Sequence, residues 1–264
     1  MFKIKLPPKL SFSKIELFFK NKGLGFLVRE SKKEITNNLN SKSTYPPDLI
    51  DLYRLYQFII LNKRTTVLEF GSGWSSLIFC LALDELNKKY FKEMRRLRRN
   101  NPFELFILEN EKKYLNITKN RIVNFKKSTK FMTKINWHFS DCEMTLFENK
   151  IATQYKKIPL CNPDFIYLDG PDQFKIKKEI NGVHTGHNDL MPMACDILKF
   201  EYFFTPGTII VCDGRGANAK FLKDHFKRKW YYYNDKNNDQ HIFYLIDPPL
   251  GKYNKLQLNF YKKK

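Results

Sequence analysis

The stretch TTVLEFGSGWSS at residues 65–76 decides the fold of this chain. Its first six residues are β-branched or apolar around a single acid, which indicates a buried strand that ends near Phe70. A Gly-Ser-Gly turn follows at 71–73, where glycine lets the backbone bend tightly and lets a ligand approach it. A helix then begins near Ser75, and its first turn has free N–H groups. Strand, glycine turn and helix in this order predict a ligand site at the carboxyl end of a parallel strand.

Outward from this stretch, the apolar periodicity alternates between strand and helix. A helix at 48–62 precedes it, and the pattern predicts further strands at 104–109, 135–140, 165–168 and 208–212, with helices at 75–99, 112–124, 189–200 and 217–229. Between two of these strands, the pattern at 141–164 indicates helix or loop. Strand-like runs at 230–233 and 241–246 predict an antiparallel hairpin at the end. We therefore expect an α/β fold: a doubly wound, Rossmann-like, mostly parallel seven-stranded sheet with a C-terminal antiparallel hairpin and helices on both faces.

The composition indicates one large globular domain with an appended segment. The chain has 264 residues, 42% of them hydrophobic, and 47 Lys and Arg against 27 Asp and Glu give a formal charge of +20. Such a charge favours an anionic partner, although a lysine-rich composition accounts for it equally well. Residues 1–45 form a basic N-terminal appendage with ten Lys or Arg against three Glu. That segment either contacts an anionic membrane or nucleic acid, or packs over the neighbouring domain and caps its site.

The cysteines and the short apolar runs indicate in which cellular compartment the protein is expected. The five cysteines are scattered and form no C-x-x-C pair, which favours reduced thiols over disulfides or a zinc site. The chain start has no apolar segment of secretory length, and no apolar run reaches the ~20 residues of a membrane span. We expect a cytoplasmic protein without a transmembrane segment, for which peripheral membrane contact stays open.

Two cofactor classes use a glycine turn of this kind. Dinucleotide binding needs G-x-G-x-x-G with an acid about 20 residues further on. Here residue 76 is serine, and the acid inside the turn, Glu69, would repel a pyrophosphate. An acid at this point suits a ligand that carries an ammonium group.

The acid-x-Gly-x-Gly pattern from Glu69 to Gly73 resembles the first motif of class I S-adenosylmethionine-dependent methyltransferases. The resemblance covers about 180 residues, from residue 65 to the terminal hairpin, with acids following the second and third strands and serine in place of the third glycine. It implies a methyltransferase-like catalytic domain at 46–264. It also implies that Glu109 binds the ribose and Asp141 the adenine amine, within a cofactor site formed by Glu69, Phe70, Gly71, Ser72, Gly73, Ser75, Glu109, Asn110, Asp141 and Cys142.

Two further strands end in carboxylates, Asp169 and Asp213, which should be neighbours beside the cofactor. This pair is similar to the acids of metal-dependent catechol-type O-methyltransferases, with Gly214 where that family has asparagine. The pair could therefore hold Mg²⁺ or another divalent cation, or Asp169 could be a general base without metal. Arg215 at the edge of the site could clamp an anionic part of the acceptor.

The loop at 172–188 is expected to cover the substrate, and it contains His184 and His187. Each histidine is either a candidate base or a solvated loop residue. The resulting hypothesis is an S-adenosylmethionine-dependent methyltransferase acting on an oxygen or nitrogen of a polar, anionic small-molecule or glycan acceptor. The alternatives are a nucleic-acid methyltransferase, which the positive charge favours, and a non-catalytic binding protein on the same fold.

Overall fold

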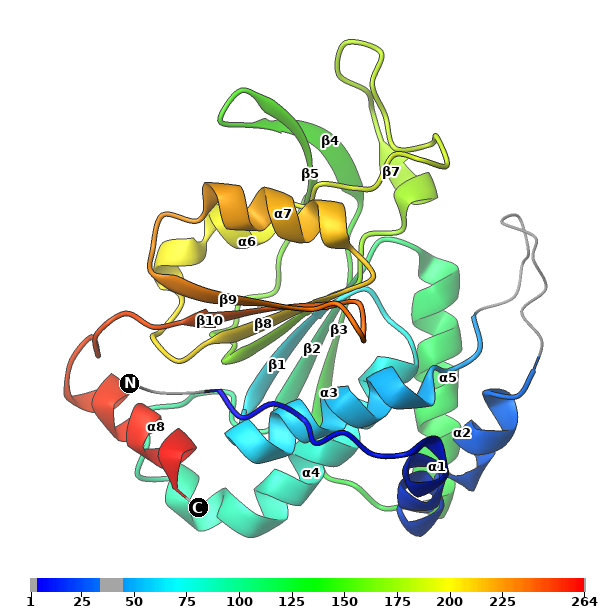
Figure 1. Ribbon diagram of the computed structural model, residues 1–264, viewed down its shortest axis with the longest axis vertical. Coiled ribbons are helices and arrows are strands. Elements are labelled where there is room, and N and C mark those ends of the chain that lie inside the picture. The colour runs from blue at the N-terminus through cyan, green and yellow to red at the C-terminus, as the bar shows by residue number, and fades with distance from the viewer. Residues whose placement is uncertain (1–3, 34–44, 264) are drawn as a thin grey trace.

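The computed structural model describes residues 4–33 and 45–263. Its centre is a seven-stranded sheet with helices on both faces (Figure 1). The strands are β1 (Thr66–Phe70), β2 (Glu104–Glu109), β3 (Lys134–Phe139), β6 (Phe165–Leu168), β8 (Ile209–Asp213), β9 (Trp230–Asp235) and β10 (Gln240–Leu245).

The order of the sheet is β3-β2-β1-β6-β8-β10-β9. Strands β1, β2, β3, β6 and β8 are parallel, whereas β10 is antiparallel to both β8 and β9. The chain adds strands in one direction from β1 to β3 and then in the other from β6 onward, so the direction reverses beside β1. The structure thus confirms the doubly wound sheet and its terminal antiparallel hairpin.

Two apolar cores lie on opposite faces of the sheet, because successive strand side chains point to opposite sides. In β1, Val67 belongs to one core and Leu68 to the other. The first core is covered by α1 (Phe12–Asn21), α2 (Gly25–Glu30), α3 (Leu49–Asn62), α4 (Trp74–Met94), α5 (Lys112–Ser128) and α8 (Lys252–Lys262). The second is covered by α6 (Asp196–Lys199) and α7 (Gly216–His225), as Figure 1 shows.

A second, smaller sheet replaces the helix or loop expected at 141–164, and that expectation was wrong. It has the order β5-β4-β7, with β4 (Cys142–Phe147), β5 (Lys150–Tyr155) and β7 (Ile176–Lys177). Its hairpin turn is made by Glu148 and Asn149, both with positive φ. Exposure alternates from Cys142 to Thr145, which is the pattern of a strand with one covered face, whereas Leu146 near the turn is exposed.

Four helices differ from their predicted extents. Helix α5 continues to Ser128, and α7 ends at His225. The helix expected at 75–99 ends at Met94, and the chain then turns so that Arg99 donates to the hydroxyl of Thr66 at 2.6 Å. The helix expected at 189–200 is confined to Asp196–Lys199. Pro192 disfavours helix in the residue before it, and Cys195 donates instead to the carbonyl of Thr153.

The described part of the N-terminal segment packs on the main domain. Ile15, Phe19 and Leu27 are at most 2% exposed and lie in the same core as β1 and α3. Residues 34–44, in the predicted basic appendage, lie outside the described residues. None of the helices in the described ranges is long and apolar enough to cross a membrane.

Candidate functional site

Four adjacent parallel strands end in carboxylates at one edge of the sheet. Glu109 ends β2 and Asp213 ends β8, while Glu69 lies one residue before the end of β1 and Asp169 directly follows β6. Neighbouring strands are about 4.8 Å apart, so these side chains gather along one edge. The direction of the sheet reverses between β1 and β6, which is where ligands bind in open α/β folds.

Glu69 is 1% exposed and its carboxylate is fully engaged by the start of α4. Ser75 donates its hydroxyl to one carboxylate oxygen at 2.5 Å, and Ser76 donates to the other at 2.6 Å. Burial raises the pKa of Glu69 to about 8 against the effect of these two hydrogen bonds. Both oxygens of the Glu69 carboxylate are therefore used to anchor the start of α4.

The turn after β1 is packed tightly against the turn after β6. Gly71 has φ of +98°, and a Cβ atom there would lie 3.2 Å from the Asp169 carbonyl. A Cβ atom at Gly170 would lie 2.6 Å from the Gly71 nitrogen. Both positions thus require glycine. Gly73 differs, because a Cβ atom there would have only the Ser75 hydroxyl nearby, at 3.8 Å.

Glu109 is 2% exposed and accepts three hydrogen bonds. One carboxylate oxygen accepts the N–H groups of Asn110 and Glu111 at 2.8 and 2.9 Å. The other accepts the Ser72 hydroxyl at 2.8 Å, from the middle of the glycine turn. Burial raises the pKa of Glu109 to about 7. The carboxylate is thus oriented to accept a hydroxyl donor beside the turn.

The other predicted cofactor residues lie around this centre in different environments. Phe70 and Cys142 are fully buried in the core, while the Asn110 amide exchanges two hydrogen bonds with the Asp172 backbone. Asp141 precedes β4, and Lys177 donates to its carboxylate at 2.8 Å. This hydrogen bond lowers the pKa of Asp141.

Asp213 belongs to a polar network that spans three elements. The Tyr167 hydroxyl donates to its carboxylate at 2.9 Å. Burial and then the charge of Asp169 raise the pKa of Asp213 to about 7. Asp51, in the first turn of α3, lies close enough that Asp213 helps burial to raise the pKa of Asp51 to about 8. The structure therefore brings Asp169 and Asp213 together, as predicted, and adds Asp51.

Asp51 was not among the predicted site residues, because it reaches the site from α3 and not from the end of a strand. Gln240 of β10 is the neighbour of Asp213 in the sheet and donates to Asp51 at 3.3 Å. Arg54, 5% exposed, donates in turn to Gln240 at 2.8 Å and orients its amide. The only local indication was the spacing of Asp48 and Asp51, which places two acids on one side of the helix start.

Arg215 lies at the edge of the site, whereas the two histidines lie on the loop after β7 and their rings accept hydrogen bonds from residues of that loop. The Arg215 guanidinium donates to the carbonyls of Asp169 and Pro171 at 2.6 and 3.2 Å and lies 3.7 Å from the Asp169 carboxylate. His184 and His187 are exposed on the loop, and each accepts an N–H from a residue two positions later. In the described ranges, no group of three or more His, Cys, Asp or Glu side chains has the geometry of a metal site.

Comparisons with known proteins identify no family. No protein-family model matches the chain, and no curated protein matches it. Among solved structures, the chain is similar to an O-methyltransferase from Bacillus cereus in complex with SAH, at 12% identity and a TM-score of 0.39. The alignment covers 91% of this chain and 92% of that chain. A similarity this distant carries no functional inference, so the site must be interpreted from its own residues.

Proposed function

We propose that the protein is an S-adenosylmethionine-dependent methyltransferase that transfers a methyl group to an oxygen or nitrogen of a polar acceptor. The observation that carries this proposal is the pair of buried carboxylates, Glu69 and Glu109, on either side of a glycine turn at the edge where the sheet reverses. The cofactor supplies the methyl group as an electrophile next to a positively charged sulfur.

Glu109 and Gly73 have complementary proposed roles in binding S-adenosylmethionine, whose nucleoside part carries two ribose hydroxyls. Glu109 already accepts one hydroxyl, that of Ser72, and two ribose hydroxyls need an acceptor of this kind. The open space over Gly73 allows a ligand to lie against the backbone. When ionised, Glu69 adds a negative charge behind the turn; burial raises its pKa to about 8, and this ionised form favours a cationic ligand over a pyrophosphate.

Asp213 and Asp169 are the groups proposed to take the proton from the acceptor. The pKa of Asp213 is raised to about 7, which is the range in which a general base is efficient at neutral pH. Arg215 binds the backbone at Asp169 and Pro171, so its proposed role is to position Asp169 and to face any anionic group of the acceptor. The exposed His184 and His187 remain candidate acceptor contacts.

The dependence of cofactor affinity on pH tests the proposal. Glu69 and Glu109 have raised pKa values of about 8 and 7, so both are largely protonated near pH 6. A cationic ligand favours the ionised forms, and its affinity should rise several-fold between about pH 6 and pH 7.5 as protons are released. Calorimetry with S-adenosylmethionine measures this rise. Tighter binding of NAD under the same conditions would contradict the proposed cofactor.

Asp213→Asn should separate binding from turnover. The variant keeps the size of the side chain but cannot accept a proton, so release of S-adenosylhomocysteine should fall by about 100-fold or more. Cofactor affinity should change by less than about twofold, since Asp213 lies outside the ribose contact. The assay uses a panel of hydroxyl and amine acceptors. Equal turnover by the variant and the unmodified protein on an active acceptor would remove Asp213 from the mechanism.

A further inference from the structure

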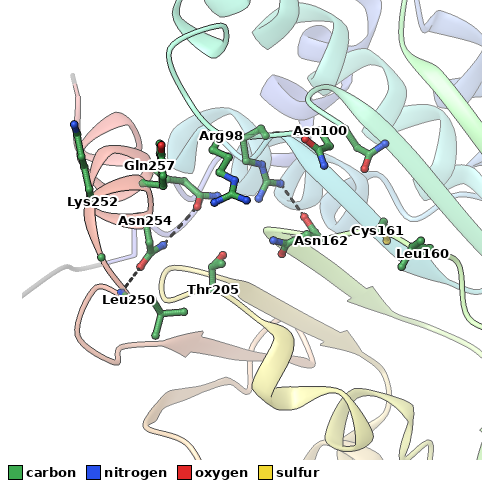
Figure 2. A pocket seen from close by; sticks show the side chains of 14 residues that line it. Arg98, Asn100, Leu160, Cys161, Asn162, Thr205, Leu250, Lys252, Asn254 and Gln257 are labelled. Carbon is green, nitrogen blue, oxygen red and sulfur yellow. Dashed lines mark hydrogen bonds between the residues drawn. The ribbon is translucent and has the colours of Figure 1, made fainter.

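A pocket with a volume of about 690 Å³ lies at the opposite edge of the sheet, where the parallel strands begin (Figure 2). Its walls are the segment after α4, the segment before β6, Thr205 before β8 and the start of α8. Arg99 in the wall of the pocket donates to Thr66, which is the first residue of β1, whereas Glu69 of the candidate active site is near the last residue of β1. The length of this strand, at about 3.3 Å per residue, therefore separates the pocket from the candidate active site.

The pocket is positively charged, and only part of this charge has a carboxylate partner. Its lining has three cations, Arg98, Arg99 and Lys252, and no carboxylate. Arg99 is satisfied by Thr66, by the carbonyl of Asn162 and by Asp164 at 3.5 Å. Within residues 4–33 and 45–263, no ion pair joins Arg98 or Lys252 to an acid. Arg98 therefore has no carboxylate partner at the pocket, whereas Figure 2 shows the Lys252 side chain extending away from Arg98 and Asn162.

Arg98 is held in place over an aromatic ring. Its guanidinium lies 5.3 Å from the centre of the Tyr253 ring, and Figure 2 shows the side chain between α8 and the segment of Asn162. A guanidinium fixed in this way offers a planar set of donors that matches a phosphate group. Beside it, the Tyr253 and Leu250 side chains are 56% and 66% exposed, so an apolar surface borders the cations.

The first turn of α8 adds backbone donors to the same wall. The helix has 11 residues and begins after Gly251, whose missing side chain leaves the turn without a side-chain cap. Free N–H groups in the first turn of a helix attract anions, and they are independent of the Arg98 charge. Arg98 and the start of α8 thus line one pocket, whose volume is in the range of small-molecule sites.

From these features we infer that the pocket binds a small phosphate monoester. The phosphoryl group contacts Arg98 and the first turn of α8, which begins at Lys252, and the organic part packs on Tyr253 and Leu250. The planar donors of Arg98 and the free N–H groups of the turn match the oxygens of one phosphoryl group. A volume of about 690 Å³ suits a small ligand. The inference does not depend on the proposed methyltransferase activity, because β1 separates the two sites.

The test uses the full chain, with phenyl phosphate as the probe and calorimetry as the measurement. Arg98→Gln should weaken binding by about tenfold or more, since it removes a charge-assisted contact. Arg96→Gln is the matched control, because it removes the same charge two residues away without lining the pocket, and it should change affinity by less than about twofold. Phenol should not bind, and inorganic phosphate should bind more weakly than phenyl phosphate.

Amide chemical shifts then locate the ligand. Phenyl phosphate should shift the backbone amide signals of Lys252 and Tyr253, and the affinity for S-adenosylmethionine should be equal in both variants. Equal weakening by Arg98→Gln and Arg96→Gln would show diffuse charge attraction and overturn the inference. Undetectable binding of phenyl phosphate would also overturn it. The same holds if an oligoribonucleotide with free hydroxyl ends binds in an Arg98-dependent way and phenyl phosphate does not displace it.

Discussion

Gly170→Ala is expected to destabilise the protein by roughly 3 kcal/mol or more, among the largest effects of any single methyl group in the chain. The added Cβ atom would lie 2.6 Å from the Gly71 nitrogen, 2.8 Å from the Phe70 carbonyl carbon and 2.8 Å from the Tyr155 hydroxyl. Two of these contacts are backbone atoms of the glycine turn, which is anchored by the pairing of β1 with β6. Relief of the clash must therefore distort the candidate cofactor site as well.

Urea denaturation of the variant and the unmodified protein measures this loss. Gly25→Ala is the control, because the nearest atom to a Cβ there is the flexible Lys20 side chain at 4.0 Å, and its stability should stay within about 0.5 kcal/mol. A loss below about 1 kcal/mol for Gly170→Ala would show that the two turns are not packed as described.

Glu109→Ala is expected to reduce the affinity for S-adenosylmethionine by about 100-fold. Two ribose hydroxyls would lose a charged acceptor, and each such hydrogen bond is worth roughly 1.5 kcal/mol or more. Because the alanine variant also frees the N–H groups of Asn110 and Glu111, Glu109→Gln is the second variant. It retains an oxygen for those N–H groups but turns the other oxygen into a donor, so affinity should still fall by about tenfold or more.

Calorimetry measures both Glu109 variants against a control from the same strand. Glu104→Ala removes an acid at the start of β2, at the opposite edge of the sheet, and should leave cofactor affinity unchanged. If Glu104→Ala and Glu109→Ala bind equally well, Glu109 has no role in holding the ribose.

The strand ends and the glycine turn could be predicted because they depend on local patterns. The apolar run at 65–70 is buried on both faces in the structure, and Gly71 has the positive φ that only glycine adopts readily. That Asp169 and Asp213 end neighbouring strands was implied by the resemblance to the methyltransferase fold, and β6 does pair with β8. Local pattern and tertiary structure agree in this half of the chain.

Asp51 and the third strand of the second sheet could not be predicted from local patterns. The hairpin of β4 and β5 is local, and the alternation from Cys142 to Thr145 is a strand signal that was overlooked. The pairing of β4 with β7, more than 30 residues later, has no local signature. Asp51 joins the acids only because α3 packs with its first turn at the carboxyl edge. The shorter helix before Asp196 is different, since Pro192 marks that boundary in the sequence itself.

Gly73→Ala tests the central claim most directly, because the fold places no demand on this glycine. Its backbone is extended, with φ of −172°, and a Cβ atom would meet only the Ser75 hydroxyl, at 3.8 Å. We expect unchanged unfolding in urea together with a loss of about tenfold or more in calorimetric affinity for S-adenosylmethionine, because the methyl group fills the space where the cofactor approaches the turn. Undiminished affinity in Gly73→Ala, or no binding of S-adenosylmethionine to the unmodified protein at about 1 mM, would contradict it.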